Sequence, residues 1–382
     1  MSFAQTMMTL TISCLCGTSR QELKSRLPYL LPSDAEVDRH GSGVLFVSHL
    51  AIDPPDQEKL SELSKYDFNG RTRFFSVAGK HGFFTVATGV IVDSPDEREG
   101  LIVGRPPVDD TRDGGLGPWL PLAEMKGRTQ KRQKEELWNA QHNSIPASCG
   151  CGNVQLLVQR PLELLEVGTK SHEEVRLPWS PYSDLMCPFK TTSKDKLDNP
   201  SDEKWYLCGT GEDCRYLAGT CACKSCRLGT GYEIQTWAFI PRMAISICVD
   251  LESIRHGTGS SLNTTHETNS PDHYIPLDFE ALAALPDGRN PLRSYESSPG
   301  VSRELCHNCG ATVFWHSKVR PELIDFSVGL LQASEGARAE SLLGWWRDRC
   351  SFAEDAGLDR KGWVKDWAEG LIHGLEEGMK SK

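Results

Sequence analysis

Seven cysteines in three ordered groups constrain this chain more than any other feature of its sequence. The groups are a Cys-x-Cys pair, a Cys-x-Cys-x-x-Cys run and a Cys-x-x-Cys pair; their members are Cys149 and Cys151, then Cys221, Cys223 and Cys226, then Cys306 and Cys309. Close-set cysteines in a chain without a secretion signal favour metal or redox chemistry over disulfides, because cytosolic thiols are kept reduced.

Composition excludes several classes of function. The formal net charge of −10 is poorly suited to neutralising phosphates, so we expect no nucleic-acid partner. No apolar run approaches the ~20 residues that span a bilayer, and the N-terminus has no basic segment ahead of an apolar one, so we expect neither membrane association nor a targeting peptide. We therefore expect a cytoplasmic protein, and its 382 residues suit two domains better than one.

The two halves of the chain begin with the same pattern. Ser-Cys-x-Cys-Gly occurs at 13–17 and again at 148–152, and the segment 87–90 resembles 327–330. We interpret this as a duplicated module that is degenerate in its first copy, the alternative being chance similarity between two β-hairpins. In the first copy, Ser76 and Gly79 are expected at the positions of the second cysteine pair, and a middle segment near 47–50 lacks the Cys-x-Cys-x-x-Cys run.

The remaining patterns predict a mainly β fold with peripheral helices. We expect a degenerate module at 10–104, a linker at 105–144 whose charged run at 126–136 is compatible with a short helix, a cysteine-rich domain at 145–340 and a helical tail at 341–382. Short strands are expected at 85–92, 154–158, 244–249 and 312–315, and loops at 160–216 and 256–272. The helical spacing of the tail is carried by Leu342, Leu343, Trp345, Trp346, Trp363, Val364, Trp367, Leu371 and Ile372.

Two of the cysteine groups suit one closed zinc site. Structural zinc takes four thiolate or imidazole ligands in a tetrahedron, at ~2.3 Å from sulfur. Two ligand pairs on separate tight turns satisfy this geometry, so we expect Cys149, Cys151, Cys306 and Cys309 (the quartet) to form a structural site that couples metal binding to folding. His307 is expected to be a turn residue rather than a ligand.

The third group, Cys221, Cys223 and Cys226 (the trio), has no fourth cysteine nearby. Three protein ligands and an open position are typical of catalytic zinc. Three thiolates and Zn²⁺ sum to one negative charge, which favours a soft thiolate as fourth ligand over activation of water. The alternative is a second structural zinc completed by a histidine or by Cys214. The cysteines without partner spacing are interpreted as small hydrophobes: Cys187, Cys208, Cys214, Cys248 and Cys350.

The ordered cysteine set resembles that of the glutathione-dependent formaldehyde-activating enzyme family, also called the CENP-V/GFA family. The local strings at 148–152, 219–227 and 306–310 carry the resemblance, which covers about 148–329. It implies an Mss4-like, zinc-stapled β fold with two Zn²⁺ per chain, one structural at the quartet and one catalytic at the trio. It also implies carbon–sulfur lyase chemistry on a small-molecule thiol adduct, with glutathione as the candidate thiol. A long insertion before Cys221 departs from the family pattern, and the basic extension of the chromatin-bound members is missing.

Two hypotheses follow from these observations. In the first, the chain is an enzyme whose trio zinc holds a thiol as thiolate. Glutathione is anionic, so we expect cationic side chains near the site to bind it. The candidates are Arg215, Lys224 and Arg227. No histidine or carboxylate stands out as a general base. In the second, both zinc ions only stabilise a scaffold or protein-interaction module. The number of protein ligands at the trio separates the two hypotheses.

Overall fold

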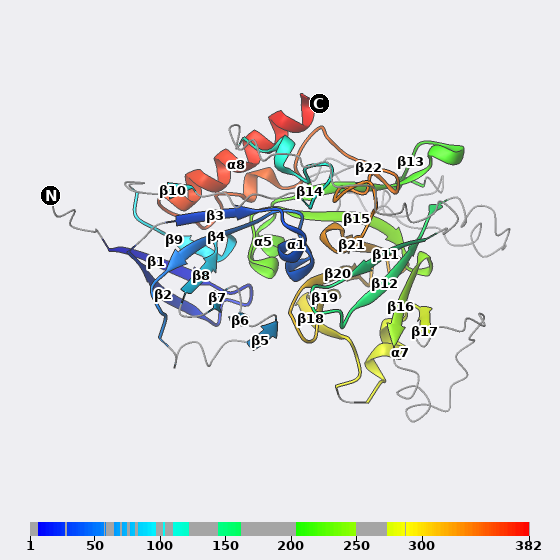
Figure 1. Ribbon diagram of the computed structural model, residues 1–382, viewed down its shortest axis with the longest axis horizontal. Helices are drawn as coiled ribbons and strands as arrows, with labels where there is room; N and C mark the ends of the chain where they lie inside the picture. The colour runs from blue at the N-terminus through cyan, green and yellow to red at the C-terminus, as the bar shows by residue number, and fades with distance from the viewer. Residues whose placement is uncertain are drawn as a thin grey trace.

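The computed structural model describes residues 7–26, 29–56, 58, 65–68, 71–74, 77–80, 83–96, 102–103, 110–121, 144–161, 204–249, 273–286 and 288–381 (Figure 1). Several predictions concern residues outside these ranges: the helix at 126–136, the loop at 256–272, most of the loop at 160–216, Ser76 and Cys187.

The first half of the chain forms two sheets. The smaller consists, in spatial order, of β2 (Arg20–Ser25), β1 (Met8–Ser13) and β9 (Ile91–Asp93). The larger consists of β10 (Ile102–Val103), β3 (Tyr29–Ser33), β4 (Val47–Ile52), β8 (Phe83–Ala87), β7 (Val77–Lys80), β6 (Arg71–Phe74) and β5 (Lys65–Phe68). Met8, Leu10 and Ile12 alternate with exposed or half-buried residues along β1, so one face of this strand lies on the core.

The second half also forms two sheets. The smaller consists of β11 (Ser144–Ser148), β12 (Gln155–Gln159), β16 (Ile245–Val249) and β17 (His273–Pro276). The larger consists of β13 (Leu207–Cys208), β14 (Arg215–Cys221), β15 (Gln235–Pro241), β21 (Leu323–Ser327), β20 (Thr312–Ser317), β19 (Val301–Cys306) and β18 (Leu292–Ser298), with β22 (Leu343–Trp345) paired to β14. Every residue of β15 is buried because this central strand is covered on both faces. A mainly β fold is therefore confirmed.

Short helical elements connect the strands. They are α1 (Glu36–Ser42), η1 (Thr88–Val90), η2 (Gly117–Trp119), η4 (Gly211–Asp213), α5 (Lys224–Thr230), η5 (Arg242–Ala244), α7 (Phe279–Ala283), η6 (Val328–Leu330) and η7 (Ala353–Asp355), where η marks a 3₁₀ turn. The strands expected at 154–158, 244–249 and 312–315 are confirmed within a residue or two at their ends. The strand expected at 85–92 is interrupted by η1.

The two larger sheets have the same strand order. In the first half, β3 and β4 flank α1 and pair with each other, and β8, β7, β6 and β5 follow across the sheet. In the second half, β14 and β15 flank α5 and pair with each other, and β21, β20, β19 and β18 follow. The helices α1 and α5 occupy the same place in this order, and each ends at a glycine in the left-handed conformation, Gly43 and Gly231.

These helix ends form reciprocal contacts between the halves. The Gly89 N–H, in η1, donates to the Gly231 carbonyl at 2.9 Å, and the Gly329 N–H, in η6, donates to the Gly43 carbonyl at 3.2 Å. A Cβ at Gly89 would lie 2.6 Å from the Gly231 oxygen, and one at Gly329 would lie 2.5 Å from the Gly43 carbonyl carbon. Glycine is therefore needed at 89 and 329 for the backbones to approach this closely.

The C-terminal segment contradicts part of the predicted helical tail. Among the described residues of this tail, only Trp363–Lys380 forms an α-helix, α8. The earlier residues Leu343–Trp345 form β22, because the edge of β14 offers backbone groups that a parallel strand satisfies. In Figure 1, α8 runs along one side of both halves: Trp363 belongs to the core of the first half, and Leu375 to the core of the second.

The described part of the predicted linker is packed rather than solvated. In the segment 110–121, Leu116, Trp119 and Leu120 are buried in the core of the second half. The turn η2 lies under α8, where a Cβ at Gly378 would be 2.1 Å from the Trp119 carbonyl oxygen. This segment therefore contributes to folding.

A buried ion pair connects the C-terminal segment to both halves. The Arg360 guanidinium donates to the Glu233 carboxylate at 2.7 and 3.1 Å, and both side chains are at most 1% exposed. It also donates to the carbonyls of Ile91, at 3.0 Å, and Thr88, at 2.8 Å, in the first half. One side chain thus satisfies acceptors from both halves of the chain.

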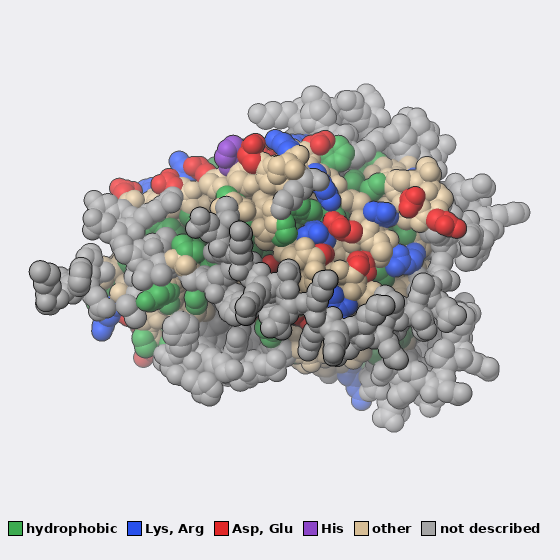
Figure 2. Space-filling model, turned by 45° about the horizontal axis from the view of Figure 1, so that its top comes forward, with side chains coloured by type: hydrophobic (Ala, Val, Ile, Leu, Met, Phe, Trp, Pro, Cys, Tyr) green, Lys and Arg blue, Asp and Glu red, His purple; other side chains and the backbone are tan. Residues whose placement is uncertain are grey.

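The surface carries charges of both signs. On the face drawn in Figure 2, the described acidic side chains are interspersed with lysines and arginines. Within the part of the chain that the structure describes, no helix is both long and apolar enough to cross a bilayer.

Candidate metal centres

The quartet is assembled from two tight turns. Cys149 and Cys151 lie in the turn between β11 and β12, and Cys306 and Cys309 lie at the turn between β19 and β20. Gly152 and Gly310 adopt left-handed conformations, with φ of 76° and 72°, and allow each chain to reverse. The structure thus brings together the four residues that the sequence paired, and their sulfurs all lie within 4.8 Å of one another.

The sulfur geometry of the quartet is compact. The Cys149 Sγ lies 3.4 Å from that of Cys151 and 3.6 Å from that of Cys306. The Val154 N–H donates to the Cys149 sulfur at 3.3 Å, and the Cys309 N–H donates to the Cys306 sulfur at 3.5 Å. These backbone donors stabilise thiolates, so the group could hold a metal ion. The exposed side chain of His307 is not a member of this group, as predicted.

The pKa values of the quartet show that its four thiols cannot all ionise independently. Hydrogen bonding to Cys151 and its other neighbours holds the pKa of Cys149 far below its ordinary value. The same contacts, starting with that to Cys149, raise the pKa values of Cys306 and Cys309. Four thiolates this close together need a cation, and that is the condition a metal ion meets.

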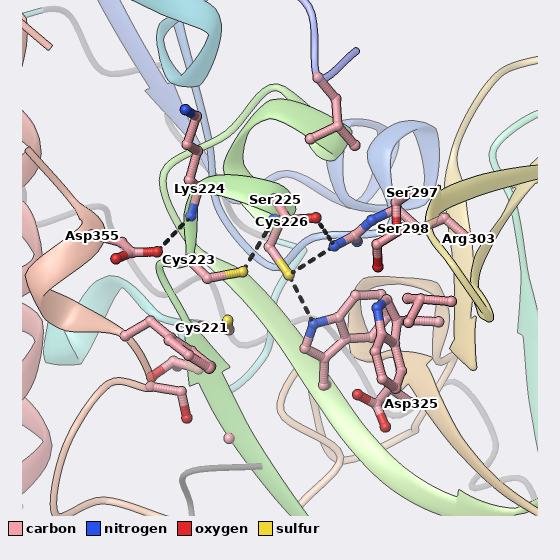
Figure 3. A pocket seen from close by; sticks show the side chains of 18 of the residues that line it. Cys221, Cys223, Lys224, Ser225, Cys226, Ser297, Ser298, Arg303, Asp325 and Asp355 are labelled. Carbon is pink, nitrogen blue, oxygen red and sulfur yellow. Dashed lines mark hydrogen bonds between the residues drawn. The ribbon is translucent and has the colours of Figure 1, made fainter. Parts of the chain in front are cut away.

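The trio is built on the N-terminus of α5. Cys221 ends β14, Cys223 is the N-cap of α5, and Cys226 lies in the first turn. The Cys223 sulfur accepts a hydrogen bond from the Cys226 N–H at 3.2 Å, as an N-cap side chain does. Because a helix N-terminus turns the chain back on itself, the spacing Cys-x-Cys-x-x-Cys directs all three sulfurs to one place (Figure 3).

Two buried donors on other strands of the same sheet contact the trio. The Trp237 indole N–H on β15 and the Arg303 guanidinium on β19 each donate to the Cys226 sulfur at 3.5 Å, and Arg303 also donates to the Ser225 hydroxyl at 2.8 Å (Figure 3). Arg303 is 3% exposed, and its Nε and Nη1 have no hydrogen-bond partner among the described residues. Hydrogen bonds from Cys221 and Cys223, then the charge of Arg303, hold the pKa of Cys226 well below its ordinary value.

The trio faces a cavity of about 520 Å³. All three trio cysteines line it, together with Arg303 and residues of the C-terminal segment, whereas no quartet cysteine does. That segment is held beside the site because the Ser351 N–H donates to the Thr220 carbonyl at 2.9 Å, and the Lys224 N–H donates to the Asp355 carboxylate at 3.1 Å. Phe352 packs on the apolar cluster around the cysteines.

No fourth protein ligand completes the trio among the described residues. The group that could hold an ion there contains Cys221, Cys223 and Cys226 alone. Cys214, the cysteine considered as a fourth ligand, directly precedes β14, whereas Cys221 ends it. Seven extended residues separate them by ~20 Å, so Cys214 cannot complete the site.

The predicted cations mostly serve other purposes. Arg227 is buried and donates to the carbonyls of Gly89, at 2.6 Å, and Leu358, at 3.3 Å, so it joins segments instead of facing the cavity. Arg215 is not among the cavity residues, and Lys224 lines the cavity but pairs with Asp359. Arg303 could not be predicted from the sequence pattern. Its only sequence signal is that it lies two residues after the buried Val301, and so on the same face of β19.

The first half carries other residues at the start of α1, the helix that has the same place in its sheet as α5. Because α1 and α5 end at equivalent glycines, Ser33, Ala35 and Asp38 stand where the three cysteines stand in the second half. Residues 47–50, where we expected this middle segment from the sequence, lie in β4. The Ser33 hydroxyl donates to the Asp38 carboxylate at 2.6 Å, so a hydrogen bond takes the place of the sulfur cluster.

The first half has a cysteine pair in a place similar to that of Cys149 and Cys151. Cys14 and Cys16 lie after β1, as Cys149 and Cys151 lie after β11. Gly79 does not lie in a turn as the predicted counterpart of Cys309 would; it lies within β7, and only residues 75–76 connect β6 to β7. That connection is shorter than the one that carries Cys309.

Comparison with known proteins found no matching family model, curated protein or solved structure. The two cysteine centres therefore rest on the sequence spacing and the geometry described above.

Proposed function

We propose that both centres bind zinc, and that the trio uses its zinc to bind a small thiol, with glutathione as the candidate, for carbon–sulfur bond chemistry on thiol adducts. The chain's activity would then be that of a carbon–sulfur lyase of the formaldehyde-activating type. The resemblance of the cysteine spacing to the CENP-V/GFA family supports this proposal, as do the residues around the trio.

The donor sets support zinc at both centres. Two sulfurs bound to one tetrahedral zinc at ~2.3 Å lie ~3.8 Å apart. The quartet distances of 3.4 and 3.6 Å approach this value without rearrangement of the turns. Four thiolates would close the quartet, as in structural sites, whereas the trio offers three ligands among the described residues.

The observation that carries the functional proposal is the position of the cavity. It adjoins the three-ligand centre and not the four-ligand one, so a small molecule can reach the one centre that has a free coordination position. When bound, zinc would lower the pKa of a coordinated thiol and hold it as thiolate. The chain's own residues would then bind and orient that thiol in the cavity.

Arg303 would compensate the negative charge of the centre. Three protein thiolates and a substrate thiolate around Zn²⁺ sum to two negative charges, and the only guanidinium that contacts the trio is that of Arg303, within the described residues. Its unpaired Nε–H and Nη1–H are buried donors that an anionic ligand would satisfy. This residue takes the role that the sequence assigned to Arg215, Lys224 and Arg227.

A duplication would explain the first half. The shared strand order of the two larger sheets and the equivalent glycines of α1 and α5 support two copies of one Mss4-like module. In this proposal, the first copy has lost its metal ligands and keeps its packing role.

We expect glutathione to bind the metal-loaded chain with release of about one proton per thiol. The thiol must lose its proton to coordinate, so apparent affinity should rise ~10-fold per pH unit as the pH increases toward the thiol pKa near ~8.5. Calorimetric titration in buffers of different ionisation enthalpy counts the protons. The Cys223→Ser variant should show no thiol binding. Heat without proton release, or no heat, would contradict thiol coordination and favour the zinc-stabilised scaffold.

We expect Arg303→Met to weaken glutathione binding ~10–100-fold, because a hydrogen bond to a charged group contributes ~1.5–3 kcal/mol. Arg303→Lys should recover part of the affinity through its charge. Arg293→Met, which removes an exposed arginine on the neighbouring strand β18, is the matched control and should leave binding unchanged. Metal content and thermal unfolding are measured in parallel; unaltered affinity in a folded, metal-loaded Arg303→Met variant would contradict the proposed role.

A further inference from the structure

A second pair of thiols lies beside the trio cavity. Cys14 and Cys16 occupy the turn after β1, and their sulfurs are 3.0 Å apart. Leu15, between them, forms part of the cavity wall, together with Ser297 and Ser298 of β18. The two cysteines on either side of Leu15 therefore adjoin the wall of a cavity whose lining cysteines all come from the second half, although neither of them lines it.

The geometry of Cys14 and Cys16 fits a redox-active dithiol better than a pair of zinc ligands. Its sulfur separation of 3.0 Å is well below the ~3.8 Å expected of two sulfurs on one tetrahedral zinc. No further metal-ligating side chain joins these two sulfurs in a group of three or more within the described part of the chain. The sequence contains no cysteine between Cys16 and Cys149, so the first half has no second pair like the one that completes the quartet.

The two thiols differ in exposure and in acidity. Cys16 is exposed, whereas Cys14 is 8% exposed and its sulfur accepts a hydrogen bond from the Ser19 N–H at 3.2 Å. Hydrogen bonds from Cys14 and then Thr18, whose hydroxyl is 2.9 Å from the Cys16 sulfur, lower the pKa of Cys16. An exposed, acidic thiol next to a shielded one is the arrangement of an attacking and a resolving cysteine.

We propose that Cys14 and Cys16 form a redox-active dithiol that exchanges with small-molecule disulfides at the edge of the trio cavity. The Cys16 thiolate attacks one sulfur of the disulfide, whose S–S bond breaks, and a mixed disulfide forms as the first thiolate leaves. The Cys14 thiolate then attacks the Cys16 sulfur and releases the second thiolate. The two cysteines are oxidised by two electrons, the small molecule is reduced to two thiols, and these take up the two protons that the cysteines lose.

This inference does not depend on the proposed function of the trio, because it requires neither zinc nor activity there. The test equilibrates the full-length chain with mixtures of reduced and oxidised glutathione, followed by alkylation of the free thiols and tryptic digestion. Cleavage after Arg20 gives a peptide of residues 1–20 whose only cysteines are Cys14 and Cys16, so their state is read by mass without interference from the metal centres.

As the proportion of glutathione disulfide rises, we expect Cys14 and Cys16 to form a disulfide. The peptide is then two hydrogens lighter than the dithiol form and carries no alkyl group. Cys14→Ser should trap one glutathionyl group on Cys16, and Cys16→Ser should form the mixed disulfide at least ~10-fold more slowly, because the remaining thiol is shielded. Cys248→Ser, outside all the clusters, should leave the midpoint unchanged. If both cysteines stayed free thiols in excess glutathione disulfide, the proposal would be overturned. It would also be overturned if the double variant Cys14→Ser/Cys16→Ser lost one metal equivalent, because the pair would then be metal ligands.

Discussion

Replacing Cys306 with serine is expected to remove one metal equivalent per chain and to unfold the second half. The Cys306 side chain is fully buried, and its sulfur lies 3.6 Å from those of both Cys149 and Cys151. Structural zinc contributes on the order of 10 kcal/mol or more to folding, whereas a typical domain is stable by only ~5–15 kcal/mol. If the quartet holds structural zinc as we propose, losing it would therefore be enough to unfold the domain. Metal analysis with urea denaturation followed by tryptophan fluorescence measures both effects.

Two variants serve as references for this experiment. Cys223→Ser removes a ligand of the open centre, so it should lose the trio metal and retain cooperative unfolding, since that centre needs only local order. Cys248→Ser changes a half-buried cysteine outside both groups and should keep both metal equivalents. If Cys306→Ser and Cys223→Ser lost solubility to the same degree, the division into a structural and a ligand-binding centre would have no support.

Replacing Arg360 with methionine is expected to lower the free energy of unfolding by ~3–5 kcal/mol, the usual cost of leaving one partner of a buried ion pair uncompensated. Glu233 would keep its buried carboxylate without the two hydrogen bonds of 2.7 and 3.1 Å. The carbonyls of Ile91 and Thr88 would also lose a donor. Because these acceptors belong to different halves, we expect the unfolding transition to broaden as the two halves become less tightly coupled.

Urea denaturation of the metal-loaded chain measures this effect. The double variant Arg360→Met/Glu233→Leu should recover part of the loss, since it removes the uncompensated charge. Lys365→Met is the matched control: Lys365 and Glu369 form an exposed pair at 3.9 Å, and such pairs contribute ~0–1 kcal/mol. An Arg360→Met variant as stable as this control would show that the buried pair does not hold the halves together.

Spacing along the chain was sufficient to predict each local cysteine group, whereas the meeting of Cys149 and Cys151 with Cys306, which is 157 and 155 residues away, is a property of the tertiary structure. Cys149 and Cys151 share one hairpin turn, and Cys221, Cys223 and Cys226 share one helix N-terminus, so local backbone geometry alone brings each group together. The mainly β character was likewise readable from short alternating segments such as 154–158. These features depend on residues a few positions apart, and the sequence determines such local geometry directly.

Other features depended on which distant segments meet. Leu342–Trp346 has helical spacing, yet part of it became β22 because β14 offered an unpaired edge. The first half has no cysteines that mark a counterpart of the trio, and only the position of α1 in its sheet points to Ser33, Ala35 and Asp38. Arg303 was missed because the guanidinium that contacts Cys226 comes from a strand on the far side of β15 and β21. Cavity walls and long-range hydrogen bonds are decided by tertiary packing, since burial and partner choice are properties of the assembled core rather than of any local pattern.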